Sequence, residues 1–213
     1  MASALMSGHL HFAMALTLSY LLGSLPGSLL VGRLRGVDIR KLGSGNAGAT
    51  NALRTQGKIF AAVTVLIDAG KGALAALVIA KLSPRPEAAF ACAFAAVLGH
   101  CFPLFFGFRG GKGASTAFGA MLALIPFTAL IAFSTWLICL IGSGYVGLST
   151  VIAALTGAIA VLTITPLPMP TILYAEATFL LIAGLHHGNI QRLIAGTESR
   201  FEKARLLRRF FGG

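Results

Sequence analysis

The sequence predicts an all-α fold, a polytopic membrane bundle that forms a single domain over residues 1–213. Composition is the first reason, because 56% of the 213 residues are hydrophobic and only 11% are charged. A soluble domain has about 25% charged residues. The second reason is that apolar runs of membrane-spanning length recur along the chain, and the third is that basic residues cluster beside them. The chain is too short for two ordinary domains.

The apolar runs locate the expected helices. A helix needs about 20 apolar residues to cross a bilayer, and the clear candidates are residues 10–31, 59–81, 87–107, 145–165 and 170–186. The first run lacks the basic flank and small-residue cleavage site of a signal peptide, so we expect a retained span. The stretch 114–141 carries Pro126 near its middle. It fits either one kinked helix or two short helices in a hairpin.

Basic residues decide between these alternatives. Segments 33–58, 109–112 and 192–209 hold six, two and six of the 17 Lys and Arg residues. The positive-inside rule places all three on the cytoplasmic face, which requires a hairpin at Pro126. We therefore predict seven transmembrane helical segments, two of them short, with the N-terminus periplasmic and the C-terminus cytoplasmic. The tail from Gln191 is basic and amphipathic, as expected of an interfacial segment.

Several function classes are disfavoured by the same composition. A net charge of +11 would suggest nucleic acid in a soluble protein, but here the cations flank apolar runs and face an anionic leaflet. The three cysteines, Cys92, Cys101 and Cys139, lie in apolar segments without metal-ligand spacing. We expect buried thiols, no metal and no nucleic-acid partner.

The segment "GSGNAGATN" at 43–51 is unusually polar for a membrane-protein loop. Glycines let backbone N–H groups converge on one anion, and four side chains add polar groups: Ser44, Asn46, Thr50 and Asn51. Arg54 follows three residues after Asn51, at helical spacing. The structural alternative is a glycine-rich turn that caps a helix.

A second glycine-rich segment, "GFRGGKG" at 107–113, surrounds two cations with four glycines. It is not a Walker A loop, because Lys112 is followed by Gly113 rather than Ser or Thr. A loop that only fixes topology needs cations but not glycines, so the pattern favours an anion site. The amides of the helix that begins with Ala114 and Ser115 would strengthen it.

Ionisable residues inside the expected spans are costly and therefore informative. Asp68 and Lys71 stand at i, i+3 and share a helix face. Such a pair is either functional or purely structural. His100 ends its span beside the second glycine loop, and Glu176 is isolated in the last span without an assigned role.

The segment "HHGNIQRLIAGTE" at 186–198 closes the last span. His186, Asn189 and Arg192 recur at i, i+3, i+6, which predicts one helix face. We expect Glu198 to pair with one of the basic loops. Together the three polar clusters suggest a site for several phosphate-like charges, beside an apolar bundle that holds a lipid chain.

These three stretches, the second extended to "GHCFPLFFGFRGGKGAST", closely resemble the signatures of the bacterial acyl-phosphate:glycerol-3-phosphate acyltransferase family, PlsY. The resemblance implies a seven-helix inner-membrane enzyme with its active site on the cytoplasmic face. It implies acyl transfer from acyl phosphate to the 1-hydroxyl of glycerol 3-phosphate, giving lysophosphatidic acid and phosphate. We expect no cofactor, a membrane-lipid environment and a monomer. The H-x-x-x-x-D pair of another acyltransferase class is absent from the sequence.

Carried over by position, the resemblance assigns two sets of residues. The candidate catalytic residues are Ser44, Asn46, Arg54, Asp68, Lys112, His186 and Asn189. The candidate substrate-binding residues are Gly45, Asn51, Lys71, His100, Gly110, Gly111, Gly113, Ser115, Ser149, Thr150, Arg192 and Glu198. In "YVGLST" at 145–150, Gly147 replaces a family serine and Thr150 replaces another.

Two other functions fit part of the pattern. A transporter or flippase for a phosphorylated metabolite would place glycine-broken helices at the midplane as inverted repeats. The polar motifs here cluster at one predicted face, and no internal repeat is evident. A non-catalytic membrane scaffold would not need convergent glycine and asparagine motifs.

Overall fold

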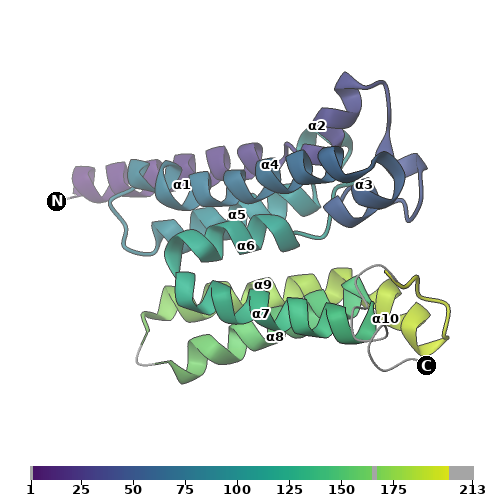
Figure 1. Cartoon of the computed structure of the whole chain (residues 1–213). Helices are drawn as coiled ribbons and strands as arrows, with labels where there is room; N and C mark the ends of the chain where they lie inside the picture. The colour runs from purple at the N-terminus through teal and green to yellow at the C-terminus, as the bar shows by residue number, and fades with distance from the viewer. Residues whose placement is uncertain (1, 165–166, 202–213) are drawn as a thin grey trace. The chain divides into compact units, whose positions relative to one another are not determined.

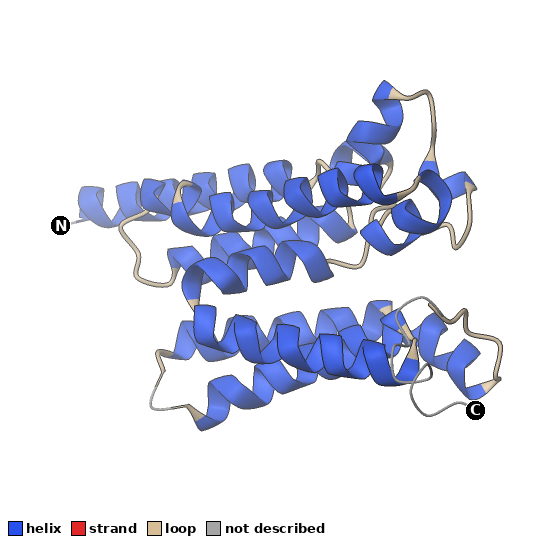
Figure 2. Cartoon of the chain, viewed as in Figure 1, coloured by secondary structure: helices blue, strands red, loops and turns tan. Residues whose placement is uncertain are grey.

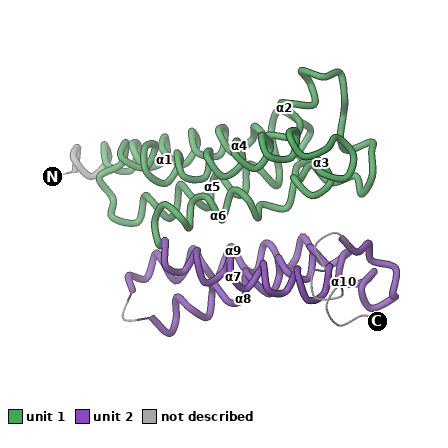
Figure 3. Tube along the Cα trace, in the orientation of Figure 1, with its two compact units in different colours: residues 1–125 green, residues 126–213 purple. Residues whose placement is uncertain are grey.

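The computed structural model of the chain describes residues 2–164 and 167–201, and side chains from residue 6 onward. Every regular element in these ranges is helical, so the all-α prediction is confirmed for the described residues (Figure 2). The chain forms two compact units, residues 1–125 and 126–213 (Figure 3). The basic tail beyond residue 201 lies outside the described residues.

Unit 1 is built from long helices laid side by side, with short helices at one end (Figure 1). The α-helices are α1 (Ala2–Gly23), α2 (Gly27–Leu34), α3 (Ala49–Gln56), α4 (Lys58–Leu77), α5 (Ala88–Cys101) and α6 (Ala114–Leu124). Three 3₁₀ turns join them: η1 (Ile39–Lys41), η2 (Ile79–Leu82) and η3 (Leu104–Phe106). Unit 2 contains α7 (Pro126–Ser143), α8 (Val146–Thr163), α9 (Met169–Leu185) and α10 (His187–Ile194).

Four helices of the described part are long and apolar enough to cross a membrane, or up to six spans if each of two bent helix pairs counts as one. The protein is therefore a helical membrane protein, as predicted. Helix α6 has 11 residues, which fits the expected short segment. Helix α7 has 18 residues and is long enough to cross a membrane, so the expectation that both helices around Pro126 are short is wrong for α7.

Proline explains the main departures from uninterrupted spans. Pro126 begins α7, where its missing N–H costs nothing, and the predicted break at this residue is confirmed. The predicted continuous span over 10–31 is wrong, because α1 ends at Gly23 and α2 resumes at Gly27 with a bend of 49°. Pro26 lies in this break. A proline inside a helix removes one hydrogen bond and clashes with the preceding turn.

Glycines let helices of unit 1 approach at backbone distance. A Cβ at Gly72 of α4 would overlap the Thr116 carbonyl of α6, and a Cβ at Gly119 of α6 would overlap the Ala69 carbonyl of α4. In a membrane, where lipid is as apolar as the side chains, such close packing drives helix association. Helix α4 also contacts α1, α2, α3 and α5, so it is the central helix of the unit.

We expect Gly72→Ala to destabilise the protein by about 1–3 kcal/mol, because the added methyl group must separate α4 from α6. Gly70→Ala is the matched control, since a Cβ at Gly70 in the same helix meets nothing within 4 Å. Thermal unfolding in detergent micelles measures both. Equal unfolding temperatures for the two variants would contradict the packing role of Gly72.

Candidate active site

Asn51 organises the first glycine-rich loop from the inside. Its side chain is 1% exposed at the base of the loop. Its Nδ2 donates to the carbonyls of Leu42 at 3.0 Å and Asn46 at 3.1 Å, and its Oδ1 accepts from the Ser44 amide at 3.0 Å. Nδ2 also lies 3.1 Å from the Ile39 carbonyl. The Asn51 amide therefore fixes the loop backbone through several hydrogen bonds.

Other members of this loop are accessible from outside. Ser44, Gly45 and Arg54 are exposed, and Asn46 and Thr50 are half-buried. Gly48 is the N-cap of α3, so no Ser or Asn side chain of the motif occupies that capping position. The polar side chains are thus left for other contacts, which weakens the helix-capping alternative.

The second glycine-rich loop is fastened to the end of α5. The Gly110 amide donates to the Cys101 carbonyl at 3.2 Å, and the Gly111 amide donates to the His100 carbonyl at 3.1 Å. Gly113 adopts a positive φ of 82° as the N-cap of α6, a conformation that favours glycine. Ser115 lies in the first turn of α6, as expected, and is half-buried.

Arg40 joins the two loop regions, a role that sequence reasoning missed. Its Nη1 donates to the Phe106 carbonyl at 2.8 Å and to the Arg109 carbonyl at 3.2 Å. Asp38 holds the guanidinium through Oδ1 to Nε at 3.0 Å and Oδ2 to Nη2 at 2.9 Å. The hydrogen bonds from Arg40 lower the pKa of Asp38. The only sequence signal was an Asp–x–Arg spacing within a basic loop.

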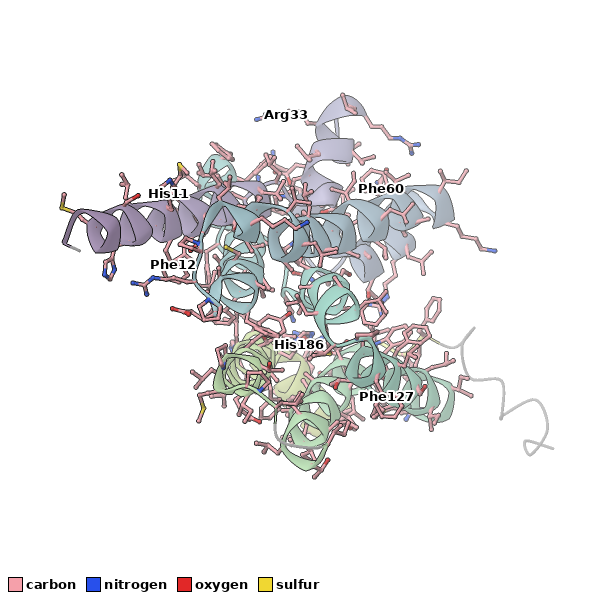
Figure 4. The ribbon with its side chains drawn as sticks, turned by 90° about the vertical axis from the view of Figure 1, so that its left-hand side faces the viewer. His11, Phe12, Arg33, Phe60, Phe127 and His186 are labelled. Carbon is pink, nitrogen blue, oxygen red and sulfur yellow. The ribbon has the colours of Figure 1, made fainter. Side chains whose placement is uncertain are left out.

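The side chains of Arg33 and Arg35 gather at the same end of the unit. Arg33 is on α2, as Figure 4 shows. Its guanidinium lies 5.4 Å from the centre of the Phe106 ring. The Arg35 guanidinium lies 5.5 Å from the centre of the Phe60 ring. Because a cation over an aromatic face is attracted by the ring quadrupole, these contacts hold two cations beside the Arg40 junction.

Three ionisable residues of the spans, Asp68, Lys71 and His100, form one buried cluster in unit 1. Lys71 Nζ lies 2.9 Å from Asp68 Oδ1 and 2.9 Å from His100 Nδ1. All three side chains are almost completely buried. Asp68 Oδ1 also accepts from the Gly27 amide at 2.9 Å, and Lys71 Nζ donates to the Leu25 carbonyl at 3.2 Å.

In unit 2, the Glu198 carboxylate binds two polar side chains of the 186–198 segment, Asn189 and Arg192. Its Oε1 accepts from Asn189 Nδ2 at 2.6 Å and its Oε2 binds Arg192 Nε at 2.7 Å. The expectation that Glu198 pairs with a basic loop is therefore wrong, because both carboxylate oxygens are bound by its own segment. Asn189 and Arg192 do lie together on α10.

His186 does not share that helix. It stands at the junction of α9 and α10, which bend by 51°, so the predicted single helix face from 186 to 192 is wrong. Its Nδ1 lies 2.8 Å from the Ile182 carbonyl, which can only accept. Nδ1 therefore carries the proton, and Nε2 of the neutral ring is a hydrogen-bond acceptor.

The segment 145–150 packs against α10 within unit 2. Ser149 Oγ donates to the Tyr145 carbonyl at 2.8 Å, and Thr150 Oγ1 donates to the Val146 carbonyl at 2.8 Å. Thr150 thus keeps a hydroxyl that is bound at the first turn of α8. A Cβ at Gly147 would lie 2.9 Å from Asn189 Cβ and 3.0 Å from its Nδ2.

The predicted residues are divided between the two units. Unit 1 holds Ser44, Gly45, Asn46, Asn51, Arg54, Asp68, Lys71, His100, Gly110, Gly111, Lys112, Gly113 and Ser115. Unit 2 holds Ser149, Thr150, His186, Asn189, Arg192 and Glu198. The fold and the loops define a helical membrane protein with polar, glycine-rich loops fixed at helix ends.

Comparison with known proteins places the chain within this class. A profile of the family described as glycerol-3-phosphate acyltransferase matches residues 13–196. The glycerol-3-phosphate acyltransferase of Rubrobacter xylanophilus is 40% identical over 184 residues, covering 86% of this chain and 92% of that protein. That of Sinorhizobium medicae is 44% identical over 187 residues, covering 87% and 90%. The chain belongs to the glycerol-3-phosphate acyltransferase family and is an acyltransferase.

Two solved structures are similar over nearly the whole chain. The crystal structure of PlsY (YgiH), an integral membrane glycerol 3-phosphate acyltransferase, in its glycerol 3-phosphate form aligns with a TM-score of 0.85 at 35% identity, covering 92% of this chain and 98% of that one. Its lysophosphatidic acid form aligns with a TM-score of 0.83 at 34% identity, covering 91% and 97%. The resemblance read from the motifs is therefore confirmed, and the transporter and scaffold alternatives are not supported.

Asp38→Asn should lower the unfolding temperature modestly at pH 7, because the pair it forms with Arg40 is partly exposed. A lowered folded-state pKa means that the ionised group stabilises the fold above the ordinary carboxyl pKa of about 3.9. This contribution disappears as the pH falls through the folded-state pKa. The difference between parent and variant should therefore close as the pH falls below the ordinary carboxyl pKa and through the lowered one, and a constant difference would exclude a charge effect.

Proposed function

We propose that the chain transfers a fatty acyl group from acyl phosphate to the 1-hydroxyl of glycerol 3-phosphate, the first acylation step of bacterial phospholipid synthesis. The products are lysophosphatidic acid and inorganic phosphate. Family membership supports the reaction. The main structural support for the site is Arg40, which precedes the first glycine-rich loop, 43–51. Its side chain donates hydrogen bonds to the backbone carbonyls of Phe106 and Arg109 in and next to the second loop, 107–113.

The reaction is a direct displacement at an activated carbonyl. The acceptor hydroxyl oxygen bonds to the carbonyl carbon, the bond from that carbon to the phosphate oxygen breaks, and the hydroxyl proton leaves. Phosphate is already a good leaving group, so the task of the protein is positioning and charge stabilisation. No Ser–His–Asp arrangement adjoins Ser44 in the described residues, which favours transfer without a covalent enzyme intermediate.

We assign the donor to unit 1. Lys112 and the amides of Gly110, Gly111 and Gly113 bind the phosphate of the donor, as a cation inside a glycine-rich loop suits an anion. Ser44, Gly45 and Asn46 polarise the reacting carbonyl or bind a phosphate oxygen. Ser115 supports the loop from the first turn of α6.

We assign the phosphate of glycerol 3-phosphate to His186 and Asn189, with Ser149, Thr150, Arg192 and Glu198 in support, and we keep Arg54 as a candidate catalytic residue of unit 1. A protonated His186 would donate to that phosphate, whereas neutral His186 offers Nε2 as a proton acceptor. Asp68 and the phosphate of the substrate are the other candidates for the hydroxyl proton.

The proposed topology follows from the basic segments. The chain is a single acyltransferase domain and a monomer in the bacterial inner membrane, with seven membrane segments and its active site on the cytoplasmic face. The N-terminus is periplasmic and the C-terminus is cytoplasmic. A reporter fused after Gly213 tests this orientation, and a periplasmic signal would refute it.

Purified protein given palmitoyl phosphate and glycerol 3-phosphate should form lysophosphatidic acid, and palmitoyl-coenzyme A or palmitoyl-acyl carrier protein should not replace the donor. Lys112→Ala should lower kcat/KM by about 10²–10³-fold, the usual effect of removing one preorganised charge-stabilising donor. Thermal unfolding verifies that the variant is folded. A near-normal kcat/KM in a folded Lys112→Ala protein would reject the phosphate loop.

Gly147→Ala should lower kcat/KM for glycerol 3-phosphate by about tenfold or more, because its methyl group displaces Asn189 and a small misplacement of a binding group is costly. Gly142→Ala is the matched control, since a Cβ there meets nothing within 4 Å. Steady-state kinetics on both variants measure the difference. Indistinguishable kinetics would mean that Asn189 does not need its present position.

A further inference from the structure

The break between α1 and α2 exposes backbone groups inside a membrane protein, and one ion pair satisfies two of them. Lys71 Nζ donates to the Leu25 carbonyl at 3.2 Å, and Asp68 Oδ1 accepts from the Gly27 amide at 2.9 Å. The Asp68 and Lys71 side chains are 1% and 3% exposed. In hydrocarbon an unsatisfied backbone group is strongly unfavourable, so the ion pair holds both ends of the break.

The same ammonium sets the protonation of His100. Lys71 Nζ has three acceptors, the Leu25 carbonyl, Asp68 Oδ1 and His100 Nδ1, and an ammonium has three protons to donate. A protonated His100 would instead place a second cation 2.9 Å from Nζ. His100 Nδ1 also lies 3.2 Å from Asp68 Oδ1. The contact with Lys71 is the shorter one, and an ammonium can only donate, so we take Nδ1 as its acceptor and place the proton of the neutral ring on Nε2.

His100 carries the connection on to the second glycine-rich loop. Its carbonyl accepts from the Gly111 amide at 3.1 Å. The Gly111 backbone also lies directly against Nε2 of the His100 ring, so that a Cβ at Gly111 would overlap this nitrogen. The Nε2–H group is thus presented to the 110–113 backbone, and a glycine at 111 is required for this approach.

Asp68, the acidic member of the ion pair, is connected to the first glycine-rich loop through α2. Asp68 fixes the Gly27 amide, and the next residue, Ser28, donates from Oγ to the Ala47 carbonyl at 2.8 Å. Ser28 is fully buried. One buried ion pair on α4 is therefore connected to both loops, through α2 to 43–51 and through His100 to 110–113.

We propose that Asp68, Lys71 and His100 are positioning residues that set the spacing between the two glycine-rich loops, rather than residues that touch substrate. This inference rests on the proposed function of those loops. It changes the roles of three residues for which the sequence suggested catalysis or substrate binding. Their burial and the mutual contacts of Asp68 Oδ1, Lys71 Nζ and His100 Nδ1 suit a fixed internal support. The substrate-facing groups are those of the loops above.

The first experiment compares kinetic constants. The double variant Asp68→Asn/Lys71→Met leaves no unpaired buried charge and keeps an acceptor for Gly27. We expect kcat to fall at least tenfold, while KM for palmitoyl phosphate and for glycerol 3-phosphate changes less than threefold. Glu87→Gln is the control, because it breaks the exposed pair with Arg85, at 3.2 Å, elsewhere in unit 1. Unchanged kcat, or a rise in KM for one substrate at constant kcat, would overturn the proposal.

Two His100 variants test the tautomer. The side-chain amide nitrogen of Gln reaches the position of Nε2, so His100→Gln keeps an N–H donor for the loop. His100→Asn reaches only the position of Nδ1. We expect His100→Gln to retain at least tenfold more kcat than His100→Asn. Equal kcat for the two variants would overturn the role assigned to the Nε2–H group.

A distance measurement is independent of catalysis. Spin labels at Leu42 and Phe108, which are 38% and 55% exposed, report the separation of the two loop regions in a background with Cys92, Cys101 and Cys139 replaced by alanine. We expect a narrow distance distribution that broadens in Asp68→Asn/Lys71→Met and stays narrow in Glu87→Gln. An unchanged distribution in the double variant would overturn the proposal. Absence of lysophosphatidic acid from the parent protein would instead refute the proposed function.

Discussion

A broken helix inside a membrane protein needs partners for its free backbone groups, and this requirement governs the polar end of unit 1. Water is absent from hydrocarbon, so the partners must come from side chains. Here they come from Asp68 and Lys71 on the central helix α4. An uncompensated charge at this depth would be very costly. The pair, the break and the loops beyond it therefore depend on one another.

Helix packing supplies the rigidity that this arrangement needs. Gly72 and Gly119 bring α4 and α6 to backbone distance, and the N-terminus of α6 is where the second glycine-rich loop ends. The same helix α4 thus carries the ion pair and anchors the helix that follows the loop. Arg40 adds a connection above the membrane-spanning segments by joining the backbone at Phe106 and Arg109 to Asp38. The buried Asp68–Lys71 pair and the more exposed Asp38–Arg40 pair are therefore both connected to the two glycine-rich loops, 43–51 and 107–113.

Much of this organisation could be predicted from the sequence, and the misses have physical causes. Apolar runs located the spans, and Pro126 located a helix boundary, because hydrophobic length and the missing proline N–H act locally. Pro26 has the same chemistry, but the apolar residues around it hid the break between α1 and α2. Glu198 could not be assigned, since its choice of Asn189 and Arg192 depends on how the chain turns after α10. From the sequence alone, Arg40 is only one of the basic residues that fix membrane topology. Its partners are the backbone carbonyls of Phe106 and Arg109, and because every residue has a carbonyl, the sequence does not show which ones a side chain binds.

The three acceptors around Lys71 have a chemical consequence as well. The donor proposed above is a mixed carboxylic–phosphoric anhydride, which acylates amines when their nitrogen lone pair attacks its carbonyl carbon and phosphate leaves. An ammonium has no lone pair, and the three acceptors around Lys71 stabilise that protonated form, so Lys71 is protected from acylation by the compound that its protein consumes. Asp68 and His100 thereby keep a lysine unreactive inside a protein that handles a reactive acyl donor.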